Sequence, residues 1–176
     1  RRVLFRSIAL SKNKQRLAVA FTGPSNSGKT TLIVKVSSIL QDQGFKVAIV
    51  KHDPKDKAMF DKEGKDSFKF SQTGADVAVV SPNKTTIFKK QTSSIEEMID
   101  IFDEFDFLLV EGLKTLPLPR ICISRNKLDD AYFDVSDTLA IDDSINQNDV
   151  PEGMNILDLN NSDEIVQWIK NNAKKV

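Results

Sequence analysis

Eight residues near the start of the chain, Gly23 to Thr30, have the types and the spacing needed to surround a polyphosphate. They match the pattern G-x-x-x-x-G-K-[ST], with a short apolar run before them and a helix-period pattern after them. Backbone N–H groups can curl around phosphates only where glycine supplies conformations that a side chain blocks, as Gly23 and Gly28 do here. The competing interpretation is a glycine-rich turn with a surface lysine. The strand-like and helix-like context favours the phosphate loop.

The side chains of this loop have separate expected roles. Lys29 is expected to reach the β- and γ-phosphates, which makes it a candidate catalytic residue, and the Thr30 hydroxyl is a candidate Mg²⁺ ligand. The N-terminus of the following helix adds about half a positive charge. The predicted nucleotide-binding residues of the loop are Gly23, Pro24, Ser25, Asn26, Ser27, Gly28, Lys29, Thr30 and Thr31.

An acidic residue, Glu111, directly follows the apolar run 107–110, whereas Asp106 precedes that run. In an open parallel sheet, ligands bind beyond the carboxyl ends of the strands, and the two acids would lie roughly 16 Å apart. Glu111 is therefore predicted to bind Mg²⁺ or to position a water molecule. This makes it both a candidate metal ligand and a candidate catalytic residue. The alternative is an ordinary loop acid before Gly112.

Three polar residues, Lys51, His52 and Asp53, follow the apolar run 46–50 at the same expected edge of the sheet. Lys51 and His52 are candidates for phosphate contact, and Asp53 is a candidate for binding Mg²⁺ directly or through water. A lone histidine is more often structural than functional. The predicted metal ligands are Thr30, Asp53 and Glu111.

The segment Asn126-Lys127-Leu128-Asp129 matches the N-K-x-D box of GTPases and follows another apolar run. In that box the carboxylate accepts hydrogen bonds from the guanine N1–H and exocyclic amine, which adenine does not offer. Asn126, Lys127 and Asp129 are therefore candidate base-binding residues. The competing interpretation is a charged turn after a strand.

Short buried strands separated by helices are expected to position these residues. Their alternation predicts an α/β fold with a mostly parallel, doubly wound sheet and right-handed crossovers. A charged segment at 55–66 without periodicity predicts a long loop near the phosphate site. The predicted helices are 29–43, 66–73, one from Ser93 or Ser94 to Phe102, and 163–173; the predicted strands are 17–21, 46–50, 76–81, 85–88, 107–110, 121–124 and 138–141.

Length and composition favour one domain at residues 8–176, because 176 residues suffice for a sizeable core. The charges balance at 25 basic and 25 acidic residues, which disfavours a nucleic-acid-binding NTPase or membrane-surface binding. The single cysteine, Cys122, excludes an internal disulfide and favours a cytoplasmic location, and the single histidine argues against a zinc or nickel cluster. Residues 1–7 look like a translated sequencing adapter and are treated as a non-native leader; a short basic leader or an amphipathic helix is the alternative.

Several separated motifs occur in a fixed order between Leu17 and Arg125. They are GPSNSGKTTLI, the Lys51-His52 pair, Gly64-Lys65-Asp66-Ser67, Thr73-Gly74-Ala75-Asp76, and FLLVEGLK followed by Pro119-Arg120-Ile121. Together they resemble the family of molybdopterin-guanine dinucleotide biosynthesis protein B. The resemblance implies a three-layer P-loop NTPase fold and a homodimeric adapter that binds GTP and Mg²⁺, with weak GTPase activity at most. It also implies contact with the molybdenum cofactor guanylyltransferase, with molybdopterin and with apo-molybdoenzymes, and it suggests roles for His52, Asp66 and Glu111.

Two functions from different classes remain open. A GTP-binding adapter with slow turnover is favoured, because no arginine finger or catalytic glutamine is evident beside the phosphate loop. The alternative is a small-molecule kinase or an ATP-dependent synthetase on the same scaffold. Such an enzyme needs an arginine-bearing lid, and the segment 55–66 contains lysines but no arginine. Pairing of sheet edges through Thr85 to Phe88 is a candidate dimer contact.

Overall fold

The computed structural model describes residues 16–176, so the predicted leader at 1–7 lies outside the described residues. The contacts within the described chain divide it into two compact units. The larger unit combines residues 16–52 with Glu104–Val176, and the smaller unit is Asp53–Asp103. The interpretation of 8–176 as one domain stays a prediction.

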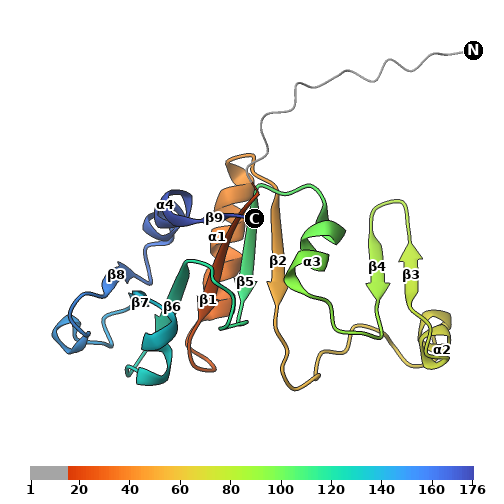
Figure 1. The fold of residues 1–176 in the computed structure, drawn as a ribbon, viewed down its shortest axis with the longest axis horizontal. Coiled ribbons are helices and arrows are strands. Elements are labelled where there is room, and N and C mark those ends of the chain that lie inside the picture. Colours follow the sequence, from red (N-terminus) through yellow and green to blue (C-terminus); the bar gives the residue numbers. More distant parts are fainter. Residues whose placement is uncertain (1–15) are drawn as a thin grey trace, which may run out of the picture. The chain divides into compact units, whose positions relative to one another are not determined.

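The larger unit is built on a seven-stranded sheet with the order β2-β5-β1-β6-β7-β8, in which every neighbouring pair is parallel (Figure 1). Only β9 runs antiparallel, against β1. The predicted α/β class with a mostly parallel sheet is thereby confirmed. The strands are β1 (Leu17–Thr22), β2 (Val47–Lys51), β5 (Phe107–Glu111), β6 (Arg120–Ser124), β7 (Thr138–Ile141), β8 (Asn155–Asp158) and β9 (Lys174–Lys175).

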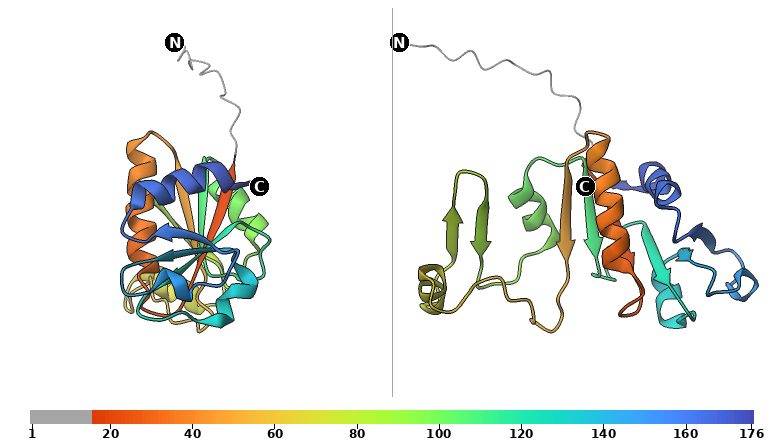
Figure 2. Two further views of the ribbon diagram at one scale, coloured as in Figure 1. Left: turned by 90° about the vertical axis from the view of Figure 1, so that its left-hand side faces the viewer. Right: turned by 180° about the vertical axis from the view of Figure 1, so that it is seen from behind.

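One face of this sheet is covered by two helices, α1 (Lys29–Asp42) and α4 (Ser162–Asn172), which lie on the same side of it (Figure 2). Alternate strand residues such as Val19 and Leu109 point to this side and form one core with the apolar stripes of both helices. Such burial contributes about 25 cal/mol per Å² of apolar surface, so this layer fixes the sheet on which the functional loops stand.

The opposite face of β6 and β7 carries a smaller core around Cys122, Leu139 and Ile141. Two 3₁₀ helices, η1 (Asp130–Val135) and η2 (Gln147–Asp149), follow β6 and β7, and Tyr132 and Phe133 of η1 pack against this core. Both faces of β6 and β7 are therefore covered, which explains why their sequences read as continuous apolar runs.

The smaller unit contains α2 (Asp66–Gln72), the hairpin β3 (Val77–Val80) and β4 (Thr85–Phe88), and α3 (Ile95–Phe102). Helix α3 begins with the capping box that the sequence predicts, because the Ser94 hydroxyl accepts from the Glu97 N–H and the Glu97 carboxylate accepts from the Ser94 N–H. Apolar side chains of the hairpin stay exposed, with Val80 at 76% and Ile87 at 49%.

The predicted elements are present within a residue or two of their expected ends, and two strands were not predicted. The edge strand β8 has the sequence NILD, in which only Leu157 is fully buried, so it lacks the apolar run of an inner strand. The two residues of β9 are both lysines and pair with β1 only because α4 returns the chain to that place. Within residues 16–176, none of the helices has the length and apolar character to cross a membrane.

Candidate functional site

The turn between β1 and α1 adopts a conformation that depends on its glycines. Gly23 has φ +136° and Gly28 has φ +97°, a region of backbone conformation that L side chains rarely adopt. A Cβ atom at Gly23 would lie 2.3 Å from the carbonyl oxygen of Ile123 in the neighbouring strand β6. Asn26 also has a positive φ, of 63°, which asparagine tolerates better than most residues. The loop therefore turns back toward α1, and no Cβ atom at Gly23 or Gly28 blocks its backbone.

The ammonium group of Lys29 lies across this loop. Its Nζ donates hydrogen bonds to the carbonyl oxygens of Gly23, at 2.9 Å, and Pro24, at 2.6 Å. Burial lowers the pKa of Lys29, and the nearby Lys51 adds to the effect while Glu111 opposes it. The first N–H groups of α1 have no partner within the helix, so they are available to an anion beside this ammonium.

A cavity of ≈ 500 Å³ opens over the loop. Its charged side chains are those of Lys29, Lys51, Arg125 and Glu111, so three cations face one carboxylate. This excess of positive charge at a helix N-terminus suits a polyphosphate. The complete lining is Ser25, Asn26, Gly28, Lys29, Thr30, Thr31, Lys51, Glu111 and Arg125.

Glu111 and Lys51 are paired within this cavity. Strands β2 and β5 run parallel with Lys51 opposite Glu111 in register, and both residues stand at the carboxyl ends of their strands. The Lys51 Nζ lies 2.9 Å from Glu111 Oε1, and the glutamate side chain is only 13% exposed. The lysine, at 61%, is mostly exposed. The structure therefore brings two of the predicted site residues into direct contact beside Lys29.

The loop also contains one buried polar group without a partner, which fits a bound nucleotide. Ser27 is 4% exposed, and its hydroxyl has no hydrogen-bond partner among residues 16–176. A buried hydroxyl without a partner is costly unless a ligand or water satisfies it. Residues 16–176 contain no cluster of three or more His, Cys, Asp or Glu side chains arranged to hold a metal ion. A Mg²⁺ ion here would depend on phosphate oxygens and water together with Thr30 and Glu111, as this ion commonly does.

Among the predicted site residues outside the phosphate loop, His52, Asp53 and Asp66 do not line this cavity. His52 donates its backbone N–H to the carbonyl of Glu111, and a Cβ at Gly112 would lie 3.0 Å from the His52 Cβ, so the histidine lies beside the turn after β5. Asp53 belongs to the smaller unit, where its carboxylate accepts the backbone N–H groups of Lys57 at 2.6 Å and Ala58 at 2.7 Å. Asp66, in the same unit, begins α2 and forms an exposed ion pair with Lys69.

The N-K-x-D segment follows β6 but contributes none of the cavity lining. The Asn126 N–H donates to the Ser144 hydroxyl at 2.7 Å, and Asn126 and Lys127 are exposed. The Asp129 carboxylate accepts from the Ala131 N–H at 3.1 Å and caps η1. The role of these residues in base recognition stays a prediction.

Arg125 is a cavity residue that the sequence reasoning missed. It follows β6 directly, and its Nε lies 2.7 Å from Asp142 Oδ2 at the end of β7. Asp142 also accepts from the hydroxyl and the N–H of Ser144, so the loops after β6 and β7 are held together. The rule that selected Glu111, a polar residue directly after a buried strand, also selects Arg125.

The decrease in unfolding free energy at low pH is expected to depend on Asp142. The Ser144 hydroxyl, together with its N–H and Arg125, holds the pKa of Asp142 below its usual value. A carboxyl whose folded-state pKa is depressed stabilises the fold above its unfolded pKa of about 3.9, and this contribution disappears as the pH falls through the folded pKa. The difference in unfolding free energy between the wild type and Asp142→Asn should therefore narrow below about pH 4. Denaturant unfolding at pH 7 and at pH 3 measures it; a constant difference would contradict the assignment.

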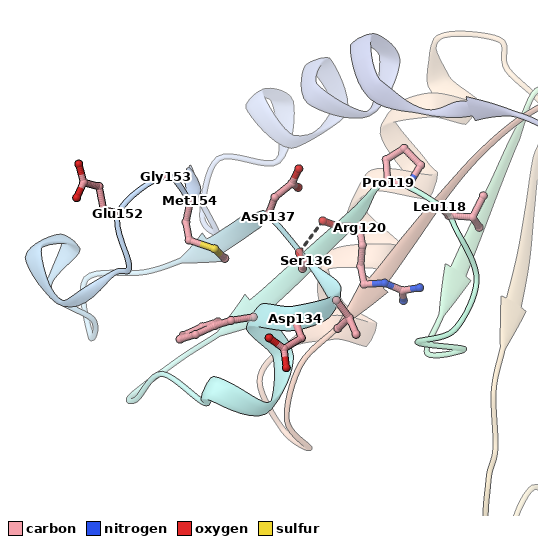
Figure 3. A pocket seen from close by; sticks show the side chains of 11 residues that line it. Leu118, Pro119, Arg120, Asp134, Ser136, Asp137, Glu152, Gly153 and Met154 are labelled. Atoms are coloured by element: carbon pink, nitrogen blue, oxygen red, sulfur yellow. Dashed lines mark hydrogen bonds between the residues drawn. The ribbon is translucent and has the colours of Figure 1, made fainter.

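A second cavity, of ≈ 460 Å³, lies where β6, β7 and β8 begin, at the strand ends away from the phosphate loop (Figure 3). Arg120 lies at its border, is 2% exposed and donates to the carbonyl oxygens of Gly112, Leu113 and Leu116. The Ser136 hydroxyl in turn donates to the Arg120 carbonyl at 2.7 Å. None of the predicted site residues lines this second cavity. Arg120 instead holds in place the loop that follows Glu111.

The parallel sheet, the glycine-dependent loop between β1 and α1 and the positively charged cavity define a P-loop protein that binds a nucleotide. The sequence profile of the family described as molybdopterin guanine dinucleotide synthesis protein B matches residues 18–142. The chain belongs to this family, which confirms the resemblance seen in the sequence.

Individual relatives agree with this membership. A relative from Methanocaldococcus jannaschii is 30% identical over 131 residues, or 71% of this chain and 54% of the relative, so the chain spans about half of that relative's length. The molybdopterin-guanine dinucleotide biosynthesis adapter protein of Haemophilus influenzae is 31% identical over 121 residues, covering 66% of this chain and 67% of that protein. The crystal structure of Bacillus subtilis MobB has the same fold, with a TM-score of 0.72 at 21% identity over 90% of this chain and 98% of that one.

Proposed function

We propose that the chain is a GTP-binding adapter protein in the biosynthesis of molybdopterin guanine dinucleotide, with weak Mg²⁺-dependent GTPase activity. In this role it assists the guanylyltransferase that attaches GMP to molybdopterin and helps to hand over the finished cofactor. The observation that carries the proposal is the phosphate loop with Lys29 across it, in a chain of this family. The adapter names of the relatives support the pathway.

The cavity residues support specific roles toward a bound nucleotide. The loop N–H groups and Lys29 hold the phosphates, and the Thr30 hydroxyl is a ligand of Mg²⁺. When bound, the metal ion neutralises charge on the phosphate oxygens. Glu111 orients water from the carboxyl end of β5, where Lys51 holds its carboxylate at 2.9 Å.

Slow hydrolysis follows from the same arrangement. The Glu111 carboxylate is engaged by Lys51, and among residues 16–176 no glutamine lines the cavity to orient an attacking water. Phosphate release from the isolated protein with Mg²⁺ should stay below about 1 s⁻¹. Faster turnover without a partner would argue for an enzyme rather than an adapter.

The nucleotide preference decides between the adapter and a kinase or synthetase. Titration calorimetry with Mg²⁺ should show GTP bound more tightly than ATP. A preference for ATP, or phosphate transfer to a small molecule, would contradict the proposal. Since Lys29 and Thr30 serve either triphosphate equally, the phosphate loop does not make this choice.

The base preference is expected to depend on Asp129. Replacing Asp129 with asparagine substitutes an amide donor for one carboxylate acceptor, so GTP should bind about tenfold more weakly and xanthosine triphosphate more tightly. Competition between the two nucleotides measures the exchange. Since Asp129 also caps η1, thermal unfolding must be compared in parallel. Unchanged GTP affinity would remove the N-K-x-D segment from the site.

A homodimer formed through the hairpin β3–β4 is part of the proposal. An isolated two-stranded hairpin is marginally stable, and its outer edges offer unpaired backbone groups to a second copy. The exposed Val80 and Ile87 would be covered by such pairing. Analytical ultracentrifugation should find a dimer at micromolar concentration, and a monomer would contradict it.

We further propose a cytoplasmic location and direct contact with the guanylyltransferase, molybdopterin and apo-molybdoenzymes. The one cysteine, Cys122, is buried and free, which suits a reducing compartment. Co-purification of the chain with the guanylyltransferase, with and without GTP, tests the partner.

A further inference from the structure

Arg125 lines the phosphate-loop cavity but lies outside the phosphate-loop motif, directly after the last residue of β6. Its guanidinium carbon and one terminal nitrogen each lie 3.9 Å from the place where a Cβ of Gly28 would be. It also lines a smaller cavity with Gly28, Thr31 and Asn160, directly beside the first turn of α1. Its side chain is 40% exposed, so a ligand can reach it.

The orientation of the Arg125 side chain is fixed by its ion pair with Asp142. Asp142 accepts from its Nε at 2.7 Å, and Asp142 is itself held by the hydroxyl and N–H of Ser144. The carboxylate engages Nε, and the terminal nitrogen beside Gly28 has no hydrogen-bond or ion-pair partner in the part of the chain that the structure describes. A guanidinium presents a rigid fork of N–H donors that matches phosphate oxygens well.

The strand order decides which end of a nucleotide Arg125 faces. Glu111 is the last residue of β5, on one side of β1, and Arg125 directly follows β6, on the other side of β1. In a P-loop the backbone holds the α- and β-phosphates, whereas the lysine and the metal ion mark the β- and γ-phosphates. Glu111, which is proposed to orient water, pairs with Lys51 on the β5 side of the cavity, so the γ-phosphate is expected there and the α-phosphate beside Arg125.

We propose that Arg125, oriented by Asp142, is a nucleotide-binding residue that contacts the α-phosphate end of the polyphosphate. This inference rests on the proposed function, because it presupposes a nucleotide in the cavity. Since the α- and β-phosphates are common to both nucleotides, Arg125 supports GDP and GTP equally. An arginine that acted on the γ-phosphate would instead distinguish them.

Titration calorimetry of GDP and GTP with Mg²⁺ tests this proposal on the full chain. Arg125→Ala should lower the affinity for GDP and for GTP by about ten- to a hundredfold. The factors for the two nucleotides should agree within about threefold. Arg125→Lys keeps the charge but loses the fork, so it should fall between the wild type and Arg125→Ala. Asp142→Asn should lower both affinities by less than Arg125→Ala does. The double variant should bind little more weakly than Arg125→Ala alone, because Asp142 acts through the arginine.

The matched control is Lys46→Ala, which removes one exposed positive charge just before β2, at the amino ends of the strands, and should leave both affinities unchanged. Thermal unfolding without nucleotide checks that each variant is folded. Unchanged affinity of folded Arg125→Ala, or a loss confined to GTP, would overturn the assignment while leaving the proposed function intact. A wild-type chain that bound neither nucleotide would overturn both.

Discussion

The variant Lys29→Ala is expected to lose GTP binding by about a hundredfold or more while remaining folded. The ammonium group is the cation that lies across the loop, 2.9 Å from the Gly23 carbonyl oxygen, and a charge-assisted contact with phosphate contributes about 1.5–3 kcal/mol. Thermal stability without nucleotide should change by less than about 1 kcal/mol, because the lost hydrogen bonds are offset by relief of the partly desolvated charge. Titration calorimetry and thermal unfolding measure the two effects.

The comparison that makes this result informative is a lysine of the same unit outside the cavity. Lys46→Ala removes an equal charge from a side chain that is 61% exposed and pairs with Glu104, so GTP affinity should stay within about twofold of the wild type. A folded Lys29→Ala protein that bound GTP as tightly as the wild type would exclude the loop as the nucleotide site. The proposed roles of Thr30 and Arg125 would then also be wrong.

Gly23→Ala is expected to be the most damaging single change in the loop. The new methyl group would lie 2.3 Å from the carbonyl oxygen of Ile123, a backbone atom in the buried strand β6, at a φ of +136° that alanine avoids. The loop or β6 must therefore move, which should lower the unfolding free energy by about 2–4 kcal/mol. The affinity for GTP should fall by at least about a hundredfold. Denaturant unfolding and nucleotide titration measure these losses.

Gly44→Ala separates the clash from the backbone strain. Gly44 also has a positive φ, of +86°, but a Cβ there has no atom within 4 Å. Its cost should be limited to the strain of a left-handed alanine, about 1–2 kcal/mol, with GTP affinity unchanged. If both variants lost equal stability and Gly23→Ala still bound GTP normally, the close approach to Ile123 would not be what requires glycine in the loop.

The local elements of this protein could be predicted from short stretches of sequence. The left-handed turn at Gly28, the stripe of α1 and the capping box at Ser94 each depend on residues within about five positions of one another, so backbone sterics and local hydrogen bonds specify them. The strand β8 could not be predicted in this way. Its sequence has one fully buried position, and it is a strand only because β7 offers an edge to pair with.

The candidate site was predicted in part, for a related reason. Lys29 and Thr30 share one loop, and Glu111 follows a strand, so chain order alone places all three at one edge of a parallel sheet. Asp53 was selected by the same rule and Asp129 by the N-K-x-D box, yet neither lines the cavity; their carboxylates accept backbone N–H groups of their own loops. Sequence patterns do not distinguish a carboxylate that faces a ligand from one that holds a turn.

The sequence by itself determined that a phosphate loop stands between a buried strand and a helix, because that conformation depends on glycines at fixed positions in one short segment. Only the tertiary structure decided that β5 and β6 flank β1, which brings Lys51 and Glu111 to one side of the loop and Arg125 to the other. These residues lie far apart in the chain. Their meeting depends on which strands pair, and strand pairing is chosen by the packing of the whole sheet against α1 and α4.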